Sequence, residues 1–247
     1  MRKLYVIPVI HASADMGTLA SLLDEASSAT LSSELWQIHQ ETVGGLWDSI
    51  GQFVDSLDIS GSKIYQDGMA VGGAEGLKIV REATRQGSKN FEIIGRLLEK
   101  GGELISAESL ALLKQEHSYL SKITASRSLR ERATAIIRYK LAKERLLKQR
   151  DHFIARKIDE TLGNGETGVL FIGAYHDILP NLPGDIKVIQ VKDVARVREY
   201  HRALLTRKRD DPQIRKLSAY LILPVSRNDL ESSCPPAIMS NDGEIQH

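Results

Sequence analysis

Short apolar runs alternate with long stretches of helical periodicity along this chain, and this alternation limits the possible folds most. The clearest run is GVLFIG at residues 168–173, and residues 4–10 are also almost continuously apolar. Such runs are typical of strands covered on both faces, and strands separated by helices are typical of parallel sheets. We therefore expect an α/β fold with a mostly parallel central sheet of about 4–6 strands and helices on both faces. The expected strands span residues 4–10, 63–67, 103–106, 168–173, 186–191 and 217–223.

Two of the segments between the strands are longer than simple crossovers require. Residues 13–58 show helical periodicity with a break near 27–33, and residues 108–163 are helical almost throughout. Ser128 and Glu131 have the spacing of a capping box, which predicts a new helix at that point. We expect one α/β domain over residues 1–229, with a long helical insertion or lid around 108–150. Residues 230–247 lack apolar periodicity and are predicted to be a disordered tail.

Composition excludes several classes of protein. The chain of 247 residues has 33 basic and 32 acidic side chains, so no overall charge bias points to nucleic acid or to an acidic membrane. A single cysteine, Cys234, rules out an internal disulfide and any multi-cysteine zinc site, which suits the cytoplasm. No stretch approaches the ~20 apolar residues of a membrane-spanning helix. Pro8 and His11 interrupt the first apolar run, which therefore reads as a strand rather than a signal peptide.

Titratable residues follow the expected strands, and this pattern predicts the position of the working site. In open parallel sheets, ligands bind outside the carboxyl ends of the strands. His11 and Asp15 follow the first strand, and Asp67 follows the second. Glu108 follows the third strand, and His176 follows GVLFIG. We expect these side chains to meet at one edge of the sheet.

Two histidines and two carboxylates allow more than one kind of chemistry. They could hold a divalent metal ion, with His11 and His176 as ligands. They could instead carry out acid–base hydrolysis without a metal, with His11, His176, Asp67 and Glu108 as the catalytic groups. Asp15 is assigned to substrate binding at the same edge.

A basic run at residues 127–150 contains nine basic and two acidic side chains. Tyr139 is its one aromatic residue, although base stacking would require more. The run is therefore interpreted as a solvated helix face or as a lid that reaches an anionic substrate. We expect neither nucleic acid nor a membrane as a partner.

The segment RDHFIARKI, which begins at Arg150, and the segment GVLFIGAYH, which ends at His176, resemble the TraB/Tiki and erythromycin-esterase/ChaN-like superfamily. The resemblance is firm over about residues 150–176. It departs from the family pattern where IPVIH lacks a glycine before His11, and where Gln66 stands in place of a glutamate. It implies an α/β fold with two histidines facing one pocket, and it implies that Asp151 orients His11 or His176. Arg150 and Asp151 carry over as residues that support the site and are assigned to substrate binding, in which Arg150 would hold an anionic group. Members include metal-dependent proteases, metal-free hydrolases and haem- or iron-binding proteins, so the reaction is not fixed.

Three functions follow from these observations. The first is a hydrolase, metal-assisted or not, that acts on a small-molecule or peptide substrate. The second is a binding protein without catalysis, such as a ligand or metal sensor. The third is an interaction protein, for example a homodimer formed through the long helices.

Overall fold

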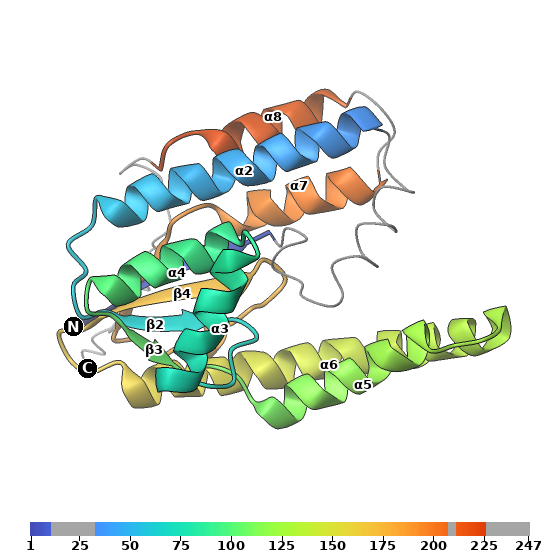
Figure 1. Cartoon of the computed structure of the whole chain (residues 1–247), viewed down its shortest axis with the longest axis horizontal. Helices are drawn as coiled ribbons and strands as arrows, with labels where there is room; N and C mark the ends of the chain where they lie inside the picture. Colours follow the sequence, from blue (N-terminus) through green and yellow to red (C-terminus); the bar gives the residue numbers. More distant parts are fainter. Residues whose placement is uncertain (11–32, 207–210, 226–247) are drawn as a thin grey trace, which may run out of the picture.

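The computed structural model describes residues 1–10, 33–206 and 211–225. These residues form an α/β fold built on a five-stranded, all-parallel sheet with strand order β3-β2-β4-β1-β5 (Figure 1), so the predicted fold class is confirmed. The strands are β1 (Arg2–Val9), β2 (Lys63–Gln66), β3 (Glu103–Ile105), β4 (Thr167–Gly173) and β5 (Ile186–Gln190). The helices are α2 (Ser33–Asp55), α3 (Gly73–Arg85), α4 (Lys89–Glu99), α5 (Leu110–Thr124), α6 (Leu129–Thr161), α7 (Val194–Thr206) and α8 (Pro212–Ile222), with a short 3-10 turn η3 (Leu179–Asn181).

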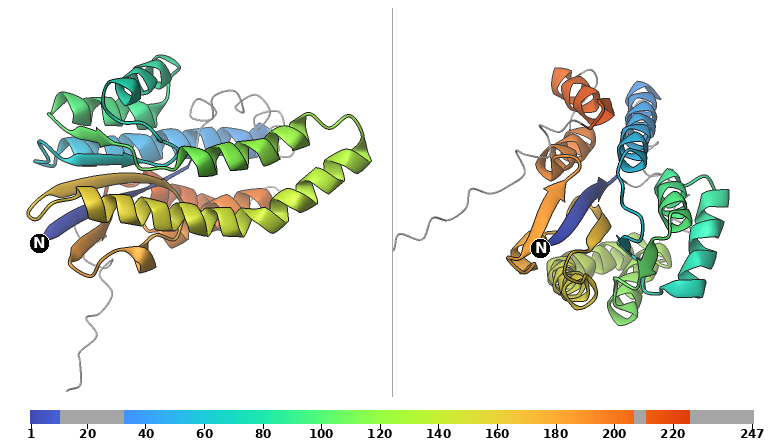
Figure 2. Two further views of the ribbon diagram at one scale, coloured as in Figure 1. Left: turned by 90° about the horizontal axis from the view of Figure 1, so that it is seen from below. Right: turned by 90° about the vertical axis from the view of Figure 1, so that its left-hand side faces the viewer.

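Alternate side chains of β1 enter two separate apolar layers. Tyr5 and Ile7 belong to the larger layer, which α2, α4, α7 and α8 cover. Leu4 and Val6 point to the opposite face, where α6 packs over the sheet. The two orientations of Figure 2 show the sheet between these layers. Successive side chains of a strand point to opposite sides of the sheet, and helices cover both sides here. This explains why β1 and β4 are nearly continuous apolar sequence.

One predicted strand is wrong. Residues 217–223 lie in helix α8 and the turn that follows it. Asp211 caps this helix by accepting a hydrogen bond from the amide of Gln213, and Pro212 occupies its first turn. Ile214, Leu217 and Leu221 then fall on one buried face at steps of three and four residues. A short apolar run does not by itself distinguish a strand from a helix, and the cap upstream decides here.

Helices α5 and α6 form a long antiparallel hairpin that extends beyond the sheet (Figure 1). Ser128 caps α6 by accepting from the amide of Glu131, as the capping-box spacing predicts. The second half of α6 carries Ile154 and Ile158 into the core under the sheet. The hairpin of α5 and the first half of α6 is called the arm below. The predicted insertion has no structural boundary at residue 150, because α6 continues from the arm into the core without a break. Among the described residues, no helix combines the length and apolarity that crossing a membrane requires.

Adjacent glycines on α2 provide a test of the packing between α2 and α8. A methyl group added at Gly44 meets nothing within 4 Å, whereas one added at Gly45 would lie 2.8 Å from Cγ1 of Ile222 on α8. We expect Gly44→Ala to stabilise the protein by about 0.5–1 kcal/mol, because alanine loses less backbone entropy in a helix. Gly45→Ala should destabilise it by about 1 kcal/mol or more through overpacking. Urea unfolding of the two variants measures the difference, and equal effects would contradict the close approach of these helices.

Several predicted features lie outside the described residues. They include the tail at 230–247, the first part of the helical stretch 13–58, and the candidate site residues His11 and Asp15.

Candidate functional site

Asp67 is fixed at the carboxyl end of the sheet by the strand that precedes it. Its amide donates to the carbonyl of Phe171 at 2.9 Å, which continues the pairing of β2 with β4 by one residue. Its carboxylate oxygen Oδ2 accepts from the amide of Gly173 at 3.1 Å. Backbone and side chain of Asp67 are therefore both attached to the end of β4, where the chain turns toward His176.

Glu108 is held close to Asp67 by hydrogen bonds to the loop that follows β2. The carbonyl of Met69 accepts from the amides of Ala107 and Glu108, at 3.0 and 3.1 Å. These bonds tie the exit of β3 to the exit of β2. The Glu108 side chain is 0% exposed, and its Oε1 accepts from the guanidinium of Arg150, from Nε at 2.9 Å and from Nη2 at 2.5 Å.

Arg150 is surrounded by three carboxylates. Besides Glu108, its Nη2 lies 2.5 Å from Oδ1 of Asp67, and its Nη1 lies 2.8 Å from Oε2 of Glu116 on α5. The other oxygen of Glu116 accepts from the hydroxyl of Tyr139 at 2.9 Å. Glu116 therefore joins α5 to α6 at the base of the arm and closes the network on that side.

Asp151, the next residue of α6, holds His176. Nδ1 of His176 lies 2.5 Å from Oδ1 of Asp151, and the amide of Asp177 donates to Oδ2 of Asp151 at 3.1 Å. On the other side of the ring, Nε2 lies 3.2 Å from Oδ2 of Asp67. Since ionised carboxylates only accept hydrogen bonds, each ring nitrogen of His176 faces a group to which it can donate.

The charges of this buried network alter its protonation. Burial alone would lower the pKa of His176, but the hydrogen bonds to Asp151 and Asp67 outweigh burial and raise this pKa to about 9. Burial raises the pKa of Glu108, although the Arg150 guanidinium opposes that rise. Burial works against the cationic form of Arg150, yet the carboxylates of Asp67 and Glu108 raise its pKa. His176 is therefore an imidazolium at neutral pH while both of its nitrogens face carboxylates.

The raised pKa predicts how pH affects the metal-free protein. The free imidazole pKa is 6.5 and the folded value is about 9, so the protonated ring stabilises the fold. This contribution is fully present below pH 6.5 and is lost as pH rises through about 9. An NMR titration of the His176 ring in protein stripped of metal should show a midpoint well above 6.5. His152, on the exposed side of α6, serves as the comparison histidine. A midpoint of His176 at or below 6.5 would contradict the double ion pair.

Asp67, Glu108 and His176 could hold a metal ion, since each offers one ligand atom and these atoms lie within 4.8 Å of one another. Two carboxylates and one imidazole form a donor set that suits divalent ions such as Mn²⁺ or Zn²⁺. Arg150 contacts one oxygen of each carboxylate, Oδ1 of Asp67 and Oε1 of Glu108. Oε2 of Glu108 is buried and has no hydrogen-bond partner among the described residues. The residues present therefore fit a metal ion.

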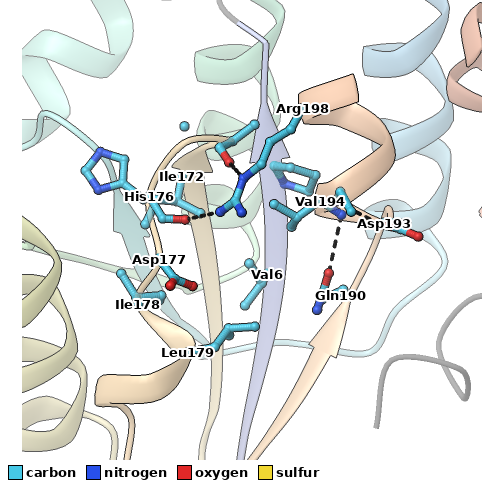
Figure 3. A pocket seen from close by; sticks show the side chains of 14 residues that line it. Val6, Ile172, His176, Asp177, Ile178, Leu179, Gln190, Asp193, Val194 and Arg198 are labelled. Carbon is cyan, nitrogen blue, oxygen red and sulfur yellow. Dashed lines mark hydrogen bonds between the residues drawn. The ribbon is translucent and has the colours of Figure 1, made fainter. Parts of the chain in front are cut away.

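A pocket of about 230 Å³ lies on the other side of the His176 backbone, at the ends of β1, β4 and β5. Arg198 on α7 donates to the carbonyl of His176 at 2.7 Å and also to the carbonyl of Ala174. Figure 3 shows that the His176 ring points away from this pocket, whereas Gln190 and Asp193 border it from the β5 side. The turn after β4 therefore separates a buried charge network from a more open pocket.

The structure brings together all five candidate residues that lie within its described part. Asp67, Glu108 and His176 form one cluster, and Arg150 and Asp151 support it. The pairing of His11 with His176 stays a prediction, because His11 and Asp15 lie outside the described residues. Sequence reasoning missed Glu116 and Arg198. Glu116 stands two turns into the helix that follows Glu108, which is a weak signal, and no pattern marked Arg198.

Comparison of the chain with protein-family models, with curated proteins and with solved structures gives no match.

Proposed function

We propose that this chain binds a divalent metal ion through Asp67, Glu108 and His176 and uses it to hydrolyse a small-molecule or peptide substrate. The observation that carries the proposal is Oε2 of Glu108, which is buried and has no hydrogen-bond partner within the part of the chain that the structure describes. An uncompensated carboxylate oxygen on a fully buried side chain is costly, and a cation or a proton would satisfy it. Its position among two other donor groups favours the cation.

The charge of the network supports the same conclusion. Four carboxylates surround two cations, Arg150 and His176. When all are ionised, the buried group has more negative than positive charge, and a divalent cation reduces this excess. Displacement of the proton on Nε2 of His176 would free that nitrogen as a ligand, so binding is expected to release a proton.

Asp151 and Arg150 would position the ligands. Asp151 accepts from Nδ1 of His176, which is the arrangement that fixes a histidine with Nε2 turned toward a metal. Arg150 donates to Oδ1 of Asp67 and to Oε1 of Glu108. These bonds fix the orientation of each carboxylate and so the direction of its other oxygen, Oδ2 or Oε2. A bound divalent ion supplies Lewis acidity, which lowers the pKa of water and polarises a carbonyl or phosphoryl group.

Metal binding is tested first, with protein that has been stripped by a chelator. Calorimetric titration and thermal unfolding with Mn²⁺, Co²⁺, Zn²⁺ and Mg²⁺ should show one site per chain and a rise in the unfolding temperature. Glu108→Gln should abolish this rise. Glu116→Gln is the matched control, because it removes a carboxylate that also contacts Arg150 but offers no ligand atom. No binding by the unmodified protein, or equal binding by Glu108→Gln, would disprove the metal site.

Hydrolysis is tested on the metal-loaded protein with a panel of esters, amides, peptides and phosphoesters. We expect turnover that requires metal and is lost in Asp67→Asn. A second function, metal sensing without catalysis, is favoured by burial: the side chains of Asp67, Glu108 and His176 are only 0–9% exposed, which leaves little room for a substrate. Retained metal with no turnover across the panel would reject hydrolysis in favour of sensing.

A further inference from the structure

The far half of α6 exposes apolar side chains that the fold does not use. Leu129, Ile137 and Leu141 are 86%, 58% and 79% exposed. Ile137 and Leu141 stand one turn apart and share a face of the helix. Ala142 and Leu146, on the opposite side, are buried. This part of α6 is therefore apolar on two sides, and only the inner side has a partner within the described chain.

Positive charge surrounds this outer apolar face. Residues 127–149 carry eight basic and two acidic side chains. Lys140 and Arg145 are exposed on either side of Ile137 and Leu141 along the helix surface, and Glu144 is an exposed acidic side chain on the same face. Within the described part of the chain, the exposed basic side chains of this half-helix take part in no ion pair; they are Arg130, Arg132, Arg138, Lys140, Lys143, Arg145 and Lys148.

A hollow of about 540 Å³ lies between the far ends of α5 and α6, next to the same face. Lys122, Arg130 and Arg138 line it and give it three positive charges. Glu131 also lines it, so the lining carries three positive charges and one negative charge. The hollow is wide enough for a phosphate-bearing headgroup, and Arg138, which lines it, is the neighbour in sequence of the exposed Ile137.

We propose that the end of the α5–α6 hairpin docks on the surface of an anionic lipid bilayer. The basic side chains would meet lipid phosphates and carboxylates, and Ile137 and Leu141 would enter the boundary between headgroups and acyl chains. A second copy of the chain is disfavoured as the occupant, because two such arms would repel each other. Nucleic acid is disfavoured because no aromatic side chain is exposed on this outer face, where apolar aliphatic ones are.

Docking at this place is compatible with the near-neutral charge of the whole chain. Acidic residues elsewhere balance the arm, so composition alone predicted no membrane partner. The arm is also remote from the metal cluster, since a rise of ~1.5 Å per residue places Leu129 roughly 30 Å from Arg150 along α6. The proposal is therefore independent of the proposed function.

Vesicle flotation with the full chain tests the proposal. We expect binding to vesicles of phosphatidylcholine with phosphatidylserine, and little binding to phosphatidylcholine alone. The double variant Arg130→Glu/Arg138→Glu and the double variant Ile137→Ser/Leu141→Ser should each weaken binding about tenfold or more. Circular dichroism should show that both remain folded, because they alter exposed side chains.

Matched controls come from α3, which lies beside the sheet and away from the far end of the α5–α6 hairpin (Figure 1). Arg81→Glu/Arg85→Glu reverses two exposed charges, and Ile79→Ser removes an apolar side chain that is 45% exposed. Both should bind like the unmodified protein. Failure of the unmodified protein to bind phosphatidylserine vesicles would overturn the proposal. Equal losses in arm and control variants would also overturn it, as would full displacement of the vesicles by short duplex DNA.

Discussion

Replacement of Arg150 by alanine is expected to lower the free energy of unfolding by about 3–5 kcal/mol, because removal of one partner leaves buried charges uncompensated. The side chain of Arg150 is 10% exposed, and it contacts Asp67, Glu108 and Glu116. Without it, three carboxylates that are largely buried would face one another with no cation between them. Equilibrium unfolding in urea, at neutral pH and without added metal, measures the effect.

Arg156→Ala is the control for this variant. Arg156 lies on the same helix, has a side chain that is 62% exposed, and pairs with Glu160 at 3.5 Å. Loss of such a surface pair costs about 1 kcal/mol or less. The double variant Arg150→Ala/Glu108→Gln should recover part of the lost stability, since one of the stranded charges is gone. A loss below about 1 kcal/mol for Arg150→Ala would show that the network is not tightly coupled.

Replacement of Asp151 by asparagine is expected to weaken divalent-metal binding by about 10–100-fold, although Asp151 is not itself a proposed ligand. The carboxylate of Asp151 accepts a hydrogen bond from Nδ1 of His176. This bond makes Nε2, the opposite ring nitrogen, a better ligand for a cation. Asparagine keeps the shape but removes the charge, so His176 would be oriented less firmly. Calorimetric titration compares the affinities.

Glu160→Gln is the control for Asp151→Asn, because it neutralises an exposed carboxylate of the same helix. Its metal affinity should equal that of the unmodified protein. An unchanged affinity in Asp151→Asn would mean that His176 is not a ligand, and it would remove the main support for the role of Asp151.

The sequence predicted the sheet and the edge at which the side chains gather, because both follow from local patterns. Asp67, Glu108 and His176 each follow a strand, and parallel strands bring their carboxyl ends to one edge. The role of Asp151 beside His176 came from the resemblance and not from spacing.

Other features depend on tertiary packing, which a single sequence does not reveal. Glu116 enters the network only because α5 folds back against α6 at one particular register. Arg150 was expected to hold an anionic group of a substrate, and within the structure its guanidinium contacts three carboxylates of the chain itself. Substrate binding by Arg150 stays a prediction. The helix α8 was misread because a short apolar run has no period of its own.

The separation of the network's members along the chain has a consequence for how the protein matures. Asp67 and the amide of Gly173 are 106 residues apart, and Arg150 and Asp67 are 83 apart. Contacts of such long range form late, after the chain has closed large loops. The donor set spans residues 67–176, so before the sheet forms a growing chain offers a metal ion only separated side chains. The metal ion would then bind after folding. It would stabilise the folded sheet and would take no part in bringing the strands together.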